Sequence, residues 1–238
     1  MIERMKRYDV LFIDLDDTLY DFSSNSLNVY REVYALMGYD RWFNDFDHYY
    51  TLYWQRNREL WALYGDNKIT KDQLNAERYT YPLLKVGVPD AEAVGARFWD
   101  EAMKRLPLGA LLMPHAREVL EYLRPRYKMY ILSNGFSELQ ARKMRSGGID
   151  HYFDGVVLSE DIGVNKPHPA IFEHALRVAG VTADRALMIG DNYEVDAKGA
   201  HGAGMDQVLY NAAGITLTPE QWQPTYLIHS LLELKEIL

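Results

Sequence analysis

The chain has no cysteine among its 238 residues, which excludes disulfide bonds and any chemistry that depends on a thiolate. It also has no long hydrophobic run. The first apolar segment, Val10–Ile13, ends at Asp14, whereas a signal-peptide core needs about 7–15 apolar residues and a membrane span about 20. The basic start, Met1–Tyr8, therefore leads into neither kind of segment. We expect a soluble, cytoplasmic protein with no membrane partner.

Positive charge is scarce as well. Lysine and arginine number 26 against 34 aspartates and glutamates, which gives a formal net charge of −8 at pH 7. Nonspecific binding to nucleic acid needs basic patches, so we expect no nucleic acid polymer as a partner. The apolar share of 48% is ordinary for a globular protein, and the length suffices for an α/β core with a smaller second unit. No feature of the sequence indicates an oligomeric state.

Three carboxylates follow the first apolar run, in the order Asp14, Asp16 and Asp17. An apolar run that ends abruptly in acids is typical of a buried parallel strand that opens into a site. Side chains at i and i+2 share a face of a strand, so Asp14 and Asp16 are predicted to point the same way. Neighbouring carboxylates repel unless a cation or a shared proton relieves them. The alternative is a strand that ends in a solvated acidic turn.

Three more polar clusters follow apolar runs farther along the chain. Ser133 and Asn134 come after one run, Lys166 lies in the loop after another, and Asp191 follows a third, with Asp196 five residues later. In an open α/β sheet, ligands bind at the carboxyl ends of the parallel strands. Carboxylates, a hydroxyl, an amide and an ammonium gathered there would hold a phosphoryl group beside a divalent metal ion.

The pattern of the chain changes twice, and these changes predict two units. Strand-like runs disappear after the first acidic cluster, amphipathic helical patterns take over, and strands alternate with helices in the second half. We therefore expect an α/β fold with a doubly wound parallel sheet. Residues 1–19 and 110–238 are predicted to form this core, and residues 20–109 an inserted all-helical cap.

The insert is unusually rich in aromatic side chains, with 18 of the chain's 31. Most recur at helical spacing, which favours ordinary packing between helices. One or two exposed rings would instead be able to stack on a nucleobase, and Tyr53 and Trp54 are the first candidates. Thr70 and Gln73 form a capping-box pattern that opens one of the helices, and Pro82 is expected to bend or interrupt that helix.

The polar clusters form four ordered motifs: Asp14-Leu15-Asp16-Asp17-Thr18-Leu19, Leu132-Ser133-Asn134-Gly135, Lys166-Pro167-His168-Pro169-Ala170-Ile171-Phe172 and Gly190-Asp191-Asn192-Tyr193-Glu194-Val195-Asp196. In this order and spacing they resemble the motifs of the haloacid dehalogenase (HAD) superfamily of phosphohydrolases. The resemblance covers essentially the whole chain, with no departure at the expected catalytic positions. The first motif and the aromatic insert after it are most similar to the subgroup of small 5′-nucleotidases.

The resemblance implies a Rossmann-like core with a helical cap, and it implies roles for the acidic residues. Asp14 is expected to be the nucleophile that becomes an aspartyl phosphate. Asp16 is expected to act as the general acid and then as the base, keeping a proton because Asp14 lies near. Mg²⁺ is the expected cofactor, held by the side chains of Asp14 and Asp191 and by the backbone carbonyl of Asp16.

The remaining motif residues are expected to bind phosphate or to support the site. Ser133 and the backbone amide of Asn134 would donate to the phosphoryl oxygens, and Lys166 would act in catalysis by neutralising their charge. Asp196 is expected to lie just outside the metal ligands and to fix its loop. The alternatives are a helix N-cap for Ser133, a solvated surface lysine for Lys166 and a helix-terminal charge for Asp196. Asp17 is expected to be a turn residue.

Together these expectations describe a Mg²⁺-dependent phosphomonoester hydrolase that acts on a small phosphorylated metabolite, preferably a nucleotide. A sugar-phosphate or phosphoglycolate phosphatase would share every catalytic residue and differ only in the cap. A phosphomutase would need the cap to retain the phosphorylated intermediate. The alternative from another class is a non-catalytic binding module on the same scaffold, which adjacent repelling carboxylates disfavour.

Overall fold

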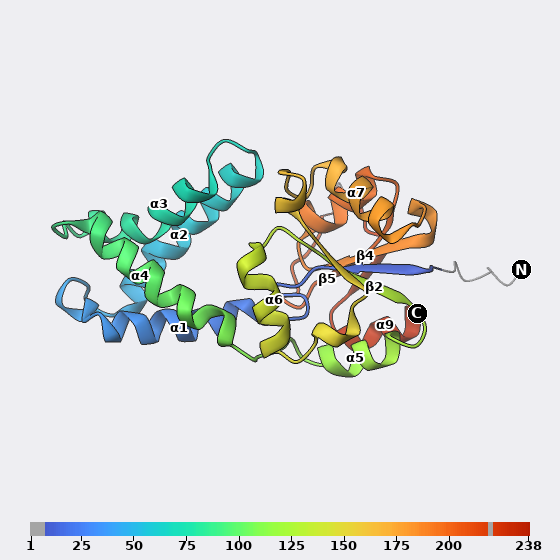
Figure 1. The fold of residues 1–238 in the computed structure, drawn as a ribbon, viewed down its shortest axis with the longest axis horizontal. Helices are drawn as coiled ribbons and strands as arrows, with labels where there is room; N and C mark the ends of the chain where they lie inside the picture. Colours follow the sequence, from blue (N-terminus) through green and yellow to red (C-terminus); the bar gives the residue numbers. More distant parts are fainter. Residues whose placement is uncertain (1–7, 219–220) are drawn as a thin grey trace, which may run out of the picture. The chain divides into compact units, whose positions relative to one another are not determined.

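The computed structural model describes residues 8–218 and 221–238 (Figure 1). Nearly all of the basic start of the chain therefore lies outside the described residues. The chain divides into two compact units, one that runs up to Phe22 and resumes at Ala110, and one that spans Ser23–Gly109. The first crossing falls after residue 22, where the sequence had placed it after residue 19, because Tyr20 forms backbone bridges with Asp16 and Leu112 of the first unit.

The first unit is built on a six-stranded sheet in the order β3-β2-β1-β4-β5-β6, and every neighbouring pair is parallel. This confirms the predicted doubly wound parallel sheet. The chain fills one side of β1 first and then the other, so the order reverses between β1 and β4. The strands are β1 (Val10–Ile13), β2 (Lys128–Ser133), β3 (Gly155–Leu158), β4 (Ala186–Gly190), β5 (Asp206–Tyr210) and β6 (Tyr226–Ile228).

Helices cover both faces of this sheet, which is why all four residues of β1 are buried and apolar. Alternate side chains of β1 enter two separate cores: Leu11 and Ile13 pack with α5 and α9, while Val10 and Phe12 pack with α7 and α8. Figure 1 shows α5 and α9 on one side of the sheet and α7 on the other. The helices of this unit are α5 (Ala116–Leu123), α6 (Ser137–Ser146), α7 (Pro169–Ala179), α8 (Lys198–Gly202) and α9 (Leu234–Ile237).

The second unit is helical. Its helices are α1 (Phe22–Leu36), which begins at the last residue of the first unit, α2 (Phe46–Gly65), α3 (Lys71–Lys85) and α4 (Ala91–Arg105). Helices α3 and α4 approach closely at Gly95, where an added Cβ would lie 2.8 Å from Thr80 Oγ1. Within the described residues, no helix has the length and hydropathy needed to span a membrane.

The capping box predicted for α3 is present. Thr70 Oγ1 accepts a hydrogen bond from the Gln73 N–H at 3.2 Å, and Gln73 Oε1 accepts one from the Thr70 N–H at 2.8 Å. The predicted interruption at Pro82 is wrong, because α3 continues to Lys85. Pro82 lies in the last turn, so only one bond near the helix end is lost, and Pro82 and Leu83 are both buried in the core of this unit.

Most aromatic rings of the insert pack against one another, as their spacing predicted. The Tyr30 hydroxyl lies 2.9 Å from that of Tyr53 and 3.1 Å from that of Tyr79, and all three side chains are buried. Burial raises the pKa of the Tyr30 and Tyr53 phenols, so both stay protonated hydrogen-bond donors. Tyr53 is only 2% exposed. Its ring belongs to the core of this unit and is not free to stack on a ligand.

Candidate active site

The four polar clusters meet at the carboxyl ends of the central strands, with Asp14 directly after β1 and Asp191 directly after β4. These two strands flank the point at which the strand order reverses. In open α/β sheets, this switch point is where a crevice for ligands forms. The solvated-turn interpretation of the first acidic cluster is wrong, because Asp14 is only 8% exposed.

Lys166 is buried at the centre of this cluster, with a relative exposure of 2%. Its ammonium donates to Asp14 Oδ1 at 2.7 Å, to Asp196 Oδ1 at 2.6 Å and to the Leu132 carbonyl at 2.7 Å. These contacts use all three donors of the ammonium group. Burial lowers the pKa of Lys166, but the charges of Asp14 and Asp196 more than offset this, so its pKa lies above the usual value. The alternative of a solvated surface lysine is wrong.

Negative charge exceeds positive charge in this cluster. Carboxylate oxygens of Asp14, Asp191 and Asp196 lie within 4.8 Å of one another. Burial raises the pKa of Asp14 well above its usual range, although Lys166 acts in the opposite direction. Burial, together with the charges of Asp196 and Asp17, raises the pKa of Asp191 to about 7. A cation would relieve this repulsion, and an all-oxygen donor set suits a hard divalent metal.

Asp196 binds Lys166 with one oxygen and accepts a hydrogen bond from the Asn192 N–H with the other, at 3.1 Å. It lies in a π-helical turn, Tyr193–Ala197, and is 2% exposed. A Cβ on Gly190 would come within 2.4 Å of this carboxylate, which explains why a glycine ends β4. Asp196 therefore does more than place a charge at a helix terminus: it joins the buried lysine to the loop after β4.

Asn134 fastens the loop that carries Lys166. Its Nδ2 donates to the Lys166 carbonyl at 2.9 Å, and its Oδ1 accepts from the Lys166 N–H at 2.7 Å. The sequence predicted a role for the backbone amide of Asn134 but not these two side-chain hydrogen bonds. The sequence also did not predict a role for Thr18, whose buried hydroxyl donates to Asp191 Oδ1 at 3.0 Å.

Ser133, the last residue of β2, is buried beside the cluster and does not cap a helix. Helix α6 starts at Ser137, and the residue at its N-cap position is Phe136, so the N-cap alternative is wrong. Ser133 Oγ accepts hydrogen bonds from the Gly135 N–H at 3.0 Å and from Gln140 Nε2 at 2.7 Å.

Asp16 is bound by two residues of α6 that the sequence interpretation missed. Lys143 Nζ lies 2.8 Å and 2.9 Å from its two carboxylate oxygens, and Gln140 Nε2 donates to Oδ2 at 3.1 Å. The sequence interpretation considered only Asp14 as a neighbour of Asp16, whereas the side chains that bind Asp16 in the structure are Lys143 and Gln140. Asp17 adopts a left-handed conformation, with φ of 60°, as suits a turn residue.

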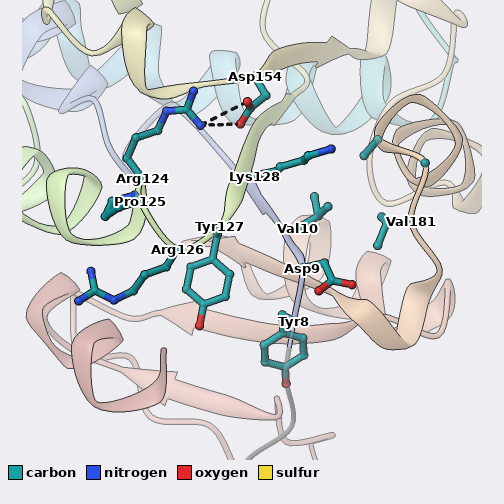
Figure 2. A pocket seen from close by; sticks show the side chains of 12 residues that line it. Tyr8, Asp9, Val10, Arg124, Pro125, Arg126, Tyr127, Lys128, Asp154 and Val181 are labelled. Carbon is teal, nitrogen blue, oxygen red and sulfur yellow. Dashed lines mark hydrogen bonds and ion pairs between the residues drawn. The ribbon is translucent and has the colours of Figure 1, made fainter.

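A cavity of about 970 Å³ lies away from the acidic cluster (Figure 2). It is lined by Asp9 and Val10 at the start of β1, by Lys128 at the start of β2 and by Asp154 just before β3. These are the amino ends of parallel strands, so the cavity opens at the edge of the sheet opposite the acidic cluster. Figure 2 shows Arg124 at this cavity paired with Asp154, at 3.0 Å.

Comparisons with known proteins agree with this geometry. A family model for haloacid dehalogenase-like hydrolases matches residues 8–204. The chain is 33% identical to the pyrimidine 5′-nucleotidase YjjG of Escherichia coli and 31% identical to the putative HAD-hydrolase YfnB of Bacillus subtilis. These alignments cover 98% of this chain in both cases, and 98% of YjjG and 97% of YfnB.

Solved structures give the same result. The crystal structure of Bacillus subtilis YfnB bound to magnesium superposes with a TM-score of 0.86 at 28% identity, over 98% of this chain and 99% of that one. The L-2-haloacid dehalogenase of Xanthobacter autotrophicus, with a TM-score of 0.74 at 21% identity over 97% and 98% of the two chains, shares the fold alone. The chain belongs to the haloacid dehalogenase-like hydrolases, and it is an enzyme of that family.

Proposed function

We propose that the protein is a Mg²⁺-dependent phosphomonoester hydrolase that acts through an aspartyl phosphate on Asp14, with a small nucleotide as its substrate. The observation that carries this proposal is the buried Asp14–Lys166–Asp196 cluster beside Asp191 at the switch point of the sheet. A binding module would have no use for a buried carboxylate with a raised pKa among like charges.

The donor set fits a magnesium ion. Three carboxylates face one ammonium in the cluster, so two negative charges are uncompensated, and oxygen is the ligand atom that Mg²⁺ prefers. Asp14 and Asp191 would hold the ion through their side chains, and the family resemblance adds the backbone carbonyl of Asp16. When bound, the ion neutralises charge on the phosphoryl oxygens.

The residues of the chain supply the other parts of the reaction. Lys166 occupies Oδ1 of Asp14, which orients the carboxylate and leaves Oδ2 to attack phosphorus. Ser133 donates to a phosphoryl oxygen, and Asp16 passes a proton to the leaving oxygen and later accepts one from water. Because Lys166 already uses its three donors within the protein, it acts first by holding Asp14, and its charge lies beside the atom that receives the phosphoryl group.

A panel of phosphate monoesters, assayed with and without Mg²⁺, tests the proposal. We expect turnover of several monoesters with kcat of about 1–10³ s⁻¹ on the best of them, the ordinary range for enzymes. Phosphate release is measured directly, and phosphodiesters serve as a control because they lack the dianionic group. No hydrolysis of any monoester in the presence of Mg²⁺ would contradict the proposal.

A nucleotide substrate is favoured by the names of two relatives and by one exposed ring. YjjG and the 28% identical PynA of Streptococcus pneumoniae are both named pyrimidine 5′-nucleotidases. In the insert, Trp54 is 39% exposed and stacks on Tyr50 with ring centroids 6.2 Å apart. The structure thus separates the two first candidates, since Tyr53 is buried and Trp54 is partly exposed.

We predict that uridine 5′-monophosphate exceeds ribose 5-phosphate in kcat/KM by roughly tenfold to a hundredfold. Both substrates contain the ribose 5-phosphate unit, and they differ at C1, which carries the base in one and a hydroxyl in the other. A stacked base contributes on the order of 1–3 kcal/mol. Trp54→Ala should remove most of this preference and spare p-nitrophenyl phosphate. Leu84→Ala, which truncates another exposed apolar side chain of the insert, is the matched control. Equal kcat/KM for the two substrates would favour the sugar-phosphate alternative.

A further inference from the structure

Two buried polar residues of α6, Gln140 and Lys143, face the site but take no part in the reaction proposed above. Gln140 is fully buried and Lys143 is 2% exposed. They are three residues apart, so they occupy neighbouring positions on one face of the helix. Buried charges and amides are costly unless they are bonded, and a buried ion pair is weak evidence for stability. Stability alone therefore does not explain why these two polar residues are buried, and the groups that they bind must be considered.

Lys143 binds Asp16 with both carboxylate oxygens within 2.9 Å. The ammonium also lies 4.2 Å from the centre of the Phe22 ring and 5.8 Å from that of Tyr20. Aromatic faces hold a cation without offering it a competing carboxylate. Lys143 thus lies against two aromatic rings as well as Asp16. Its contact with both oxygens holds the carboxylate in position, and the bond from Gln140 to Oδ2 sets its rotation.

Gln140 joins Asp16 to Ser133. Its Nε2 donates to Ser133 Oγ at 2.7 Å and to Asp16 Oδ2 at 3.1 Å, which uses both amide hydrogens. Its Oε1 is buried and has no hydrogen-bond partner within the described residues. The reversed amide would place this oxygen against the Asp16 carboxylate, so the contact with Asp16 fixes the observed orientation.

The two acceptor positions of the Ser133 hydroxyl are therefore filled. The Gly135 N–H and Gln140 Nε2 occupy them, and a hydroxyl has two acceptor positions and one hydrogen. The hydrogen is left to point away from both, which is what donation to a phosphoryl oxygen requires. A side chain at position 135 would displace this arrangement, because its Cβ would lie 2.0 Å from Gln140 Nε2.

We infer that Gln140 and Lys143 are positioning residues: Lys143 fixes the Asp16 carboxyl for proton transfer, and Gln140 couples its orientation to that of the Ser133 hydroxyl. This inference rests on the proposed function for its kinetic consequences. Neither residue touches the reacting atoms, and both act through groups that do. Residues of this kind typically contribute about 10- to 100-fold to activity.

The test compares two leaving groups in the full-length enzyme. Ribose 5-phosphate has an alkoxide leaving group that needs a proton, whereas p-nitrophenolate leaves without one. We expect Lys143→Met to lower kcat on ribose 5-phosphate by about 10- to 100-fold, with a much smaller loss on p-nitrophenyl phosphate and little change in KM. Lys143→Arg should recover part of the loss. Arg142→Met, at an exposed position of the same helix, is the matched control.

A double-mutant cycle tests Gln140. Gln140→Leu should lower kcat on both substrates, because it releases the Ser133 hydroxyl, and Ser133→Ala should cost less in the Gln140→Leu background than in the wild type. Additive losses, or equal losses of Lys143→Met on both leaving groups, would overturn the inference. Thermal unfolding checks that the variants fold. If Lys143→Met does not fold, the double-mutant cycle of Gln140→Leu with Ser133→Ala decides whether the inference holds.

Crystal structures of the variants make the outcome independent of activity. If the wild type hydrolyses neither substrate, the proposed function fails, but the positioning can still be judged. We expect the Asp16 carboxyl to rotate in Lys143→Met and the Ser133 hydroxyl to leave its rotamer in Gln140→Leu. Unchanged rotamers of Asp16 and Ser133 in both variants would overturn the inference.

Discussion

Asp14→Asn is expected to abolish phosphatase turnover while the protein remains folded. The substitution removes the atom that attacks phosphorus, and loss of a nucleophile lowers kcat on the order of 10⁶-fold in well-studied hydrolases. The side chain keeps its size, and the amide oxygen can still accept the hydrogen bond from Lys166. Burial raises the pKa of the Asp14 carboxyl, so its removal eliminates a desolvation penalty and should not lower the melting temperature.

Asp17→Asn is the matched control for this experiment, since it makes the same change three positions away. Asp17 sits in a left-handed turn, a conformation that asparagine also tolerates, so most activity should remain. Mass spectrometry of acid-quenched enzyme should find the phosphoryl group on Asp14 in the wild type and on no residue in Asp14→Asn. Substantial turnover by Asp14→Asn would mean that water attacks phosphorus directly and that the aspartyl-phosphate mechanism is wrong.

The fold could be predicted from the sequence because a local apolar run marks the central strands of the sheet. Val10–Ile13 is an uninterrupted apolar run, as a strand covered on both faces requires, and the same holds for Ala186–Ile189 before Asp191. The parallel topology then brings the ends of these runs to one edge without any further information. For this reason the sequence alone predicts that Asp14, Ser133, Lys166 and Asp191 lie together.

The residues of α6 that bind Asp16 could not be predicted from the sequence, because their role depends on which face of the helix is buried. Lys143 and Asp16 are 127 residues apart in the chain, and the sequence of α6 is typical of a polar, mostly basic surface helix. The packing of Met144 into the core next to β1 shows in the structure that this face of α6 is buried. In the sequence, the only indication of this role is that Gln140 and Lys143 are one turn apart and next to an apolar residue, Met144.

The aromatic insert shows the same limit. Helical spacing identifies which rings lie along one side of α2 but not which side faces the solvent. Tyr53 and Trp54 are adjacent in sequence, and therefore about 100° apart around the helix, so they point in different directions. The hydroxyl contacts of Tyr53 with Tyr30 place it inside, which leaves Trp54 exposed. The catalytic roles of the site residues stay predictions that the variants above must decide.

Removal of divalent metal is expected to abolish activity, and Mg²⁺ is expected to restore it. Burial raises the pKa of Asp14 and Asp191, so without a cation their protonated forms are favoured. A protonated Asp14 cannot attack phosphorus, and an ionised one repels a phosphate dianion. Loss of this electrostatic stabilisation should lower kcat by at least about 10²–10³-fold. Addition of Mg²⁺ should also raise the melting temperature, because the ion binds the folded site and not the unfolded chain. EDTA already saturated with Mg²⁺ is the control for nonspecific effects of the chelator.

The same chemistry predicts no release of halide from 2-haloacids, despite the name of the family. The family resemblance implies that dehalogenation also uses an aspartate at the position of Asp14, but needs neither a metal nor a second acid, because halide leaves without a proton. This chain has Asp16 bound by Lys143 and has Asp191 and Asp196 within 4.8 Å of Asp14. Similarity to solved haloacid dehalogenases at 21% identity shows the fold and not this reaction. Halide release from 2-chloropropionate that persists in EDTA would overturn the assignment, since it would mean that Asp14 attacks carbon and that the acidic cluster has no part in catalysis.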